Sequence, residues 1–166
     1  MKLTTLERTI AIIQFLLFLF ILFFTVDSLI TTIRFWENPP YYGGQKVTNA
    51  LLFRTYHFNI LFSVISIFSS IGLLLQKRWG WVASIIIWFT SSITTIILIV
   101  RLVLKKPYWD RIEIIFSALL ALFFFAIGCL LLTTRFKEKY KLTPSTIKVI
   151  ITIIVILSLD KLLIYR

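Results

Sequence analysis

Residues 9–26 read TIAIIQFLLFLFILFFTV, eighteen consecutive positions without a charged side chain. At a rise of about 1.5 Å per residue, an α-helix of this length matches the roughly 30 Å hydrocarbon core of a bilayer. Three further stretches share this property: 58–76, 79–100 and 114–134. The sequence therefore predicts an all-α integral membrane protein, a small helical bundle with four transmembrane helices.

A fifth candidate helix covers about residues 145–165. Thr143 and Pro144 are typical of a helix start. Only residues 149–159 are free of charge, but the flanking Lys148 and Lys161 can extend their ammonium groups towards the headgroups. Apolar residues also cover every face of the segment. We expect a fifth span here, and the alternative is an interfacial or protein-buried C-terminal helix.

The composition excludes a water-soluble domain, since 59% of the residues are hydrophobic, 15% are charged and the mean hydropathy is +0.95. The loops are too short for a separate domain, so residues 1–166 are expected to form a single transmembrane domain. A net charge of +11 indicates anchoring to the lipid bilayer and its anionic headgroups, with no nucleic acid as partner. The expected helices lie at about 7–35, 48–77, 79–104, 110–135 and 145–165.

Orientation rests on the basic residues, which divide evenly between the two sides of the expected bundle. The densest cluster, residues 135–141, and the turn with Lys77 and Arg78 both fall on the side of the N-terminus. Lys and Arg concentrated in short loops are typical of the cytoplasmic side. We therefore expect a bacterial inner (plasma) membrane protein with a cytoplasmic N-terminus and an external C-terminus.

Most acidic residues fall on the opposite, outer side, and Asp27 is the most informative of them. It lies nine residues before Trp36, about 13 Å inside the end of the first helix, and a short carboxylate cannot reach water from there. Asp27, Thr31 and Arg34 share one helix face at i, i+4 and i+7. Arg54 and His57 lie at a corresponding depth in the second helix.

Two interpretations of Asp27, Arg54 and His57 follow. In the first, Asp27 and Arg54 form an ion pair that fixes the register of the first hairpin, with His57 beside it. In the second, the three residues form a polar vestibule for an ion, a proton or a charged group of a partner. The spacing alone does not decide between the two.

Small and hydroxylated residues recur on one face of the second and of the third expected helix. Such faces let membrane helices approach closely and form hydrogen bonds across the contact. We expect them to meet over the Trp79-Gly80 turn, although hydroxyl-lined faces can also line a water path. The residues are Asn59, Ser63, Ser66 and Ser70 in the second helix, and Ser84, Ser91 and Thr95 in the third.

The sequence predicts neither a metal site nor an enzyme. One Cys and one His cannot supply the ligands of a structural zinc site or an iron–sulfur cluster, and no catalytic motif or phosphate loop is present. We therefore expect no cofactor, and a non-enzymatic accessory, assembly or regulatory subunit of a larger membrane protein complex, in contact with another membrane protein or with copies of itself. The alternative is a small oligomeric channel or transporter component whose path begins at Asp27, Arg54 and His57.

Overall fold

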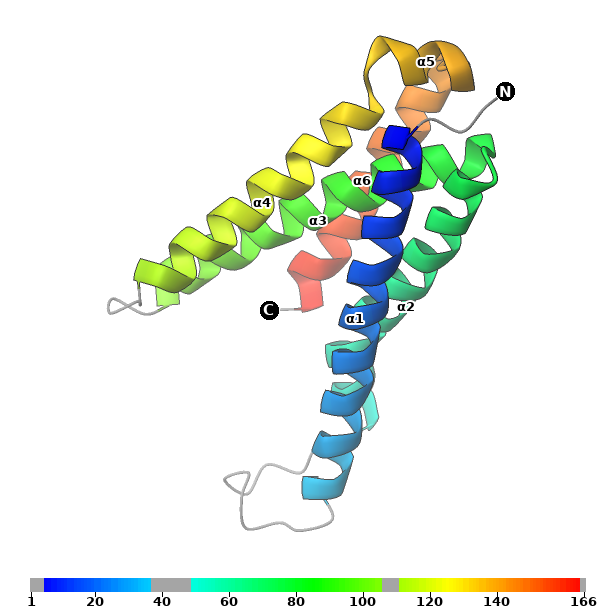
Figure 1. Cartoon of the computed structure of the whole chain (residues 1–166). Coiled ribbons are helices and arrows are strands. Elements are labelled where there is room, and N and C mark those ends of the chain that lie inside the picture. Colours follow the sequence, from blue (N-terminus) through cyan, green and yellow to red (C-terminus); the bar gives the residue numbers. More distant parts are fainter. Residues whose placement is uncertain (1–4, 37–48, 106–110, 165–166) are drawn as a thin grey trace.

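The computed structural model describes residues 5–36, 49–105 and 111–164, which form six α-helices (Figure 1). The first four helices are each long and apolar enough to cross a membrane, which confirms the predicted helical membrane fold. Large apolar side chains cover the outside of the bundle, as lipid contact requires; Phe23 is 66% exposed and Phe116 66% exposed. The helices are α1 (Thr5–Trp36), α2 (Asn49–Leu74), α3 (Arg78–Lys105), α4 (Arg111–Leu131), α5 (Thr134–Tyr140) and α6 (Pro144–Ile164).

Most predicted helix ends agree with the structure to within two residues. The second helix ends earlier than expected, at Leu74, because Gln76 adopts a left-handed conformation with φ 54°. The amide of Lys77 then donates to the carbonyl oxygen of Gly72 at 2.9 Å, a bond that closes the helix end. The predicted starts at 48 and 110 and the predicted end at 165 lie outside the described residues.

The prediction that the fourth helix continues to 135 was wrong, because α4 ends at Leu131 and a separate helix, α5, follows. Phe136 and Tyr140, one turn apart on α5, are 1% and 5% exposed, so burial of this face holds the short basic helix on the bundle. α5 and α6 meet at 107° and satisfy the criteria for a membrane span only as a bent pair. The fifth span therefore stays a prediction.

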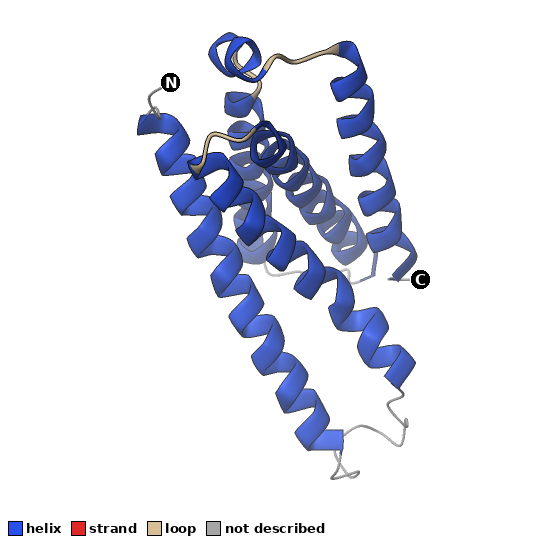
Figure 2. Cartoon of the chain, turned by 90° about the vertical axis from the view of Figure 1, so that its right-hand side faces the viewer, coloured by secondary structure: helices blue, strands red, loops and turns tan. Residues whose placement is uncertain are grey.

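α3 is the centre of the bundle, because it contacts α2, α4 and α6. Trp81 and Trp88 of α3 are completely buried, and Trp88 packs edge-on against Phe18 of α1 with ring centroids 6.1 Å apart. The N-terminus, the α2–α3 turn and α5 lie at one end, and the α1–α2 and α3–α4 hairpins diverge towards the other (Figure 1). Figure 2 shows α1 and α2 running side by side.

α2 and α3 approach most closely beside their connecting turn. A Cβ atom at Gly80 would collide with the backbone of Gly72 and Leu73, and no side-chain movement could relieve that contact. Packing of this kind, with backbone against backbone, is how membrane helices gain contact area in the absence of a hydrophobic driving force.

Candidate functional site

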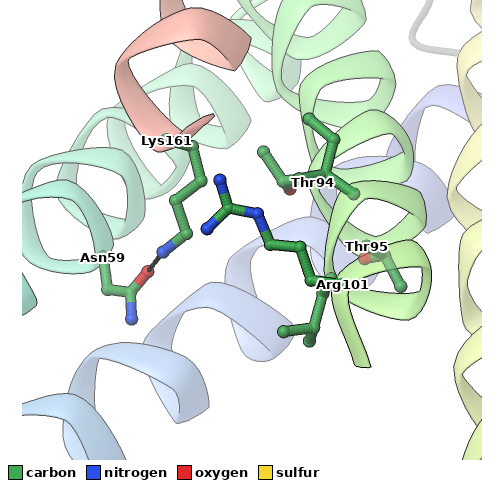
Figure 3. Close-up of a pocket in the computed structure, with 7 residues that line it drawn as sticks. Asn59, Thr94, Thr95, Arg101 and Lys161 are labelled. Atoms are coloured by element: carbon green, nitrogen blue, oxygen red, sulfur yellow. Dashed lines mark hydrogen bonds between the residues drawn. The ribbon is translucent and has the colours of Figure 1, made fainter. Parts of the chain in front are cut away.

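A pocket of about 220 Å³ lies between α2, α3 and α6, at the end of the bundle where α6 terminates (Figure 3). Arg101 of α3 and Lys161 of α6 point into it from two sides, and Asn59 of α2 faces them. The described residues that line it are Asn59, Thr94, Thr95, Ile97, Leu98, Arg101 and Lys161.

Two cationic side chains tie the last turns of α6 to its neighbours at this pocket. The Lys161 ammonium donates to Asn59 Oδ1 at 3.1 Å and lies 4.7 Å from the centroid of the Phe58 ring. The Arg101 guanidinium donates to the carbonyl oxygen of Leu162 at 2.7 Å. α6 is therefore held to both α2 and α3 by charged groups at its C-terminal end.

His57 also contacts α6. Its Nε2 lies 3.6 Å from Asp160 Oδ2, and its Nδ1 lies 2.7 Å from the carbonyl oxygen of Phe53. A carbonyl oxygen only accepts, so Nδ1 carries a hydrogen, and a second proton on Nε2 would complete a charged pair with Asp160. The sequence placed His57 beside Asp27, whereas its acidic neighbour in the structure is on α6.

The predicted ion pair between Asp27 and Arg54 is not formed. Asp27 is exposed on α1, and the structure records no ion pair between it and any residue that is described. The α1–α2 contact at this level is made instead by Tyr56, whose hydroxyl lies 3.2 Å from Ser28 Oγ and 2.8 Å from Thr32 Oγ1. Successive residues are rotated by about 100° around a helix. Because Ser28 faces α2, the preceding residue, Asp27, points away from this contact.

Asp27, Thr31 and Arg34 do share one face, as their spacing predicts, and all three are exposed. We call these three residues the Asp27 stripe. It runs along the outside of α1, whereas His57 contacts Asp160 of α6. The vestibule expected from Asp27, Arg54 and His57 stays a prediction.

The serine faces of α2 and α3 lie inside the bundle, where the sequence placed them. Ser69 of α2 is 2.9 Å from Ser84 of α3, Oγ to Oγ, and donates to the carbonyl oxygen of Gly80 at 3.0 Å. Gln14 of α1 donates to the carbonyl oxygen of Ser66 at 2.9 Å. Asn59 and Thr95 are only half-buried, because they line the pocket. Of the predicted packing residues, the buried ones are Ser63, Ser66, Ser70, Ser84 and Ser91.

Sequence reasoning missed a buried charged cluster at the opposite end of the bundle. Glu7 of α1 is completely buried, and both of its carboxylate oxygens accept from the Lys139 ammonium of α5 at 2.6 Å. Tyr140 donates to Glu7 Oε1 at 2.8 Å, and its ring stacks on Trp81 with centroids 5.2 Å apart. α5 lies outside the four single-helix spans. Burial of the Tyr140 hydroxyl raises its pKa above the usual range, and the neighbouring Glu7 carboxylate raises the pKa further.

No signal in the sequence joins Glu7 to Lys139, which are 132 positions apart. For Arg101 and Lys161 the sequence does contain a signal, because each lies within two residues of the end of an uncharged stretch. The part of the chain that the structure describes contains no group of three His, Cys, Asp or Glu side chains placed to hold a metal ion.

Comparisons with protein-family models, curated proteins and solved structures find no match to this chain.

Proposed function

We propose that this protein is a non-enzymatic accessory subunit of a larger membrane protein complex, and that a partner membrane protein packs against the Asp27 stripe of α1. The observation that carries the proposal is the exposure of Asp27 on the outer surface of the bundle, with no ion pair to any described residue. Other polar side chains at this end of the bundle, such as His57 and Lys161, contact neighbouring helices.

The depth of Asp27 makes its exposure costly in lipid. Residues 9–26 fill about 27 Å of helix, so Asp27 lies at the far boundary of the hydrocarbon core. On insertion scales an ionised side chain costs roughly 2.5–3.5 kcal/mol at the centre of a membrane helix, and less towards its ends. A basic or hydrogen-bond-donating residue of a partner helix at the same depth would offset this cost.

The polar chemistry of the stripe defines the partner further. Thr31 offers a hydroxyl one turn from Asp27, and Arg34 follows at the helix end. A partner helix with a Lys or Arg opposite Asp27 and a polar residue one turn away would match this order. We further place the end with α5 and the α2–α3 turn on the cytoplasmic side of a bacterial inner membrane, because basic residues gather there in short connections.

Purification of the complex in a mild non-ionic detergent tests this proposal. We expect a stoichiometric membrane-protein partner with wild type and with Glu113→Gln, which removes an exposed acid on α4. Asp27→Asn should weaken the association by about 10- to 100-fold at matched abundance, as expected for loss of a charged hydrogen bond. Asp27→Glu should largely restore it.

Two results would overturn this assignment. Retention of the partner by Asp27→Asn would show that the stripe is not the contact. A homo-oligomer without a foreign partner, with an Asp27-dependent cation flux in liposomes, would establish the channel alternative instead.

A further inference from the structure

We propose that the pocket between α2, α3 and α6 binds a phosphate group, with Arg101 and Lys161 as its two cationic contacts. This site is separate from the Asp27 stripe and does not depend on the partner proposed above. The sources of such a group at a membrane are phospholipid headgroups and free phosphate.

The charge of the lining supports an anionic ligand. Two basic side chains face the same pocket, and none of the described lining residues is acidic. An anion placed between two basic side chains is attracted to both of them. A guanidinium also offers a planar fork of donors that matches phosphate oxygens, and a lysine ammonium adds a compact positive charge.

The threonines of the pocket direct the ligand towards the cations. Thr94 donates its hydroxyl hydrogen to the carbonyl oxygen of Thr90 at 2.9 Å, and Thr95 donates to that of Ser91 at 2.8 Å. These hydroxyl hydrogens are engaged within α3, whereas the Arg101 guanidinium and the Lys161 ammonium have several donors each and can bind a ligand beside their contacts with Leu162 and Asn59. The ligand is therefore expected to bind against these two side chains.

The position of the pocket favours a lipid as the source. Arg101 directly follows the uncharged residues 79–100, and Lys161 follows the uncharged residues 149–159 after a single intervening acid. Both side chains therefore lie where hydrocarbon gives way to headgroups, the level at which the phosphates of bilayer lipids lie. Leu98 lines the pocket and is 41% exposed, so the pocket reaches the outer surface of the bundle, where acyl chains would lie.

The volume is sufficient for this ligand. About 220 Å³ is several times the roughly 30 Å³ that one water molecule occupies in the liquid. A phosphate group with its bridging waters therefore fits without displacement of any helix.

Thermal unfolding of the purified chain in non-ionic detergent provides the test, because a ligand specific for the folded state raises the midpoint in a saturable way. The probes are short-chain phosphatidylglycerol, inorganic phosphate and an alkyl carboxylate of matched chain length. We expect phosphatidylglycerol to stabilise wild type most strongly. Lys161→Gln should weaken its apparent Kd about 10-fold or more. Arg101→Lys, which keeps the charge but removes the fork, guards against loss of folding and should also weaken binding.

The matched control is Lys148→Gln, which removes an exposed cation near the other end of α6 and should leave the apparent Kd unchanged. Equal stabilisation by inorganic phosphate would support the site with free phosphate as its source. Equal stabilisation by the carboxylate would show that charge alone acts, and would overturn the proposal. An unchanged Kd in folded Lys161→Gln and Arg101→Lys would overturn it as well.

Discussion

Replacing Glu7 with Gln should destabilise the protein more than almost any other conservative change. The Glu7 side chain is completely buried, and the side chain of Lys139 is 8% exposed, with both carboxylate oxygens 2.6 Å from the ammonium. The amide oxygen of the introduced glutamine could still accept from Tyr140, so the main loss is the charge that balances Lys139. Removal of one partner of a buried ion pair costs roughly 3–5 kcal/mol, because the other charge stays buried without compensation. We expect a loss at the lower end of this range, since Lys139 also borders a surface pocket through which it can reach water.

Equilibrium unfolding in mixed micelles, followed by tryptophan fluorescence, measures this loss of stability. Trp81 stacks on Tyr140, so its fluorescence reports on the site itself. The matched control is Glu138→Gln, an exposed acid next to Lys139, with an expected change within about 0.5 kcal/mol. The double variant Glu7→Gln/Lys139→Gln should be more stable than Glu7→Gln alone, because it removes the uncompensated ammonium. A negligible effect of Glu7→Gln, or a double variant whose loss equals the sum of the single losses, would refute the reasoning.

Two further changes probe the helix contact and the orientation. Gly80→Ala should lower the free energy of unfolding by roughly 1–3 kcal/mol, because the new methyl group would collide with the backbone of Gly72. Gly128→Ala is the control in the same unfolding assay. It should cost less, because its methyl group would meet only the Phe89 ring, at 3.0 Å or more. On a Cys129→Ala background, a cysteine at position 138 should react with a membrane-impermeant reagent only after the membrane is broken; labelling in intact cells would reverse the proposed orientation.

The four long helices could be predicted from sequence because the thickness of a bilayer sets the length of an uncharged helix. The short helix α5 could not be predicted in the same way. Residues 134–140 have no long apolar run, and their helix depends on burial of Phe136 and Tyr140 and on the contact with Glu7, which are tertiary interactions. Local sequence contains no information about these partners.

For the candidate site, the sequence predicts how deep a residue lies in the membrane but not the direction in which its side chain points. The depth of Asp27 follows from counting residues along α1, but its direction depends on which neighbouring position faces α2. Ser28 and Thr32 are the residues that contact Tyr56 of α2, so the Asp27 carboxylate points outwards. His57 and Lys161 were assigned to the same side of the membrane, and the structure brings both to the contact between α2 and α6. Their partners lie about a hundred residues away, and the sequence does not say that α6 packs against α2.

The contact between Glu7 and Lys139 also imposes an order on biosynthesis. Lys139 follows Glu7 by 132 residues, which corresponds to roughly 7–26 s at usual rates of translation. Throughout that interval α1 can be inserted in the membrane while its carboxylate has no ammonium to meet, so Glu7 must stay hydrated at the membrane surface. Closure of α5 over Glu7 is therefore a late event in the synthesis of the chain.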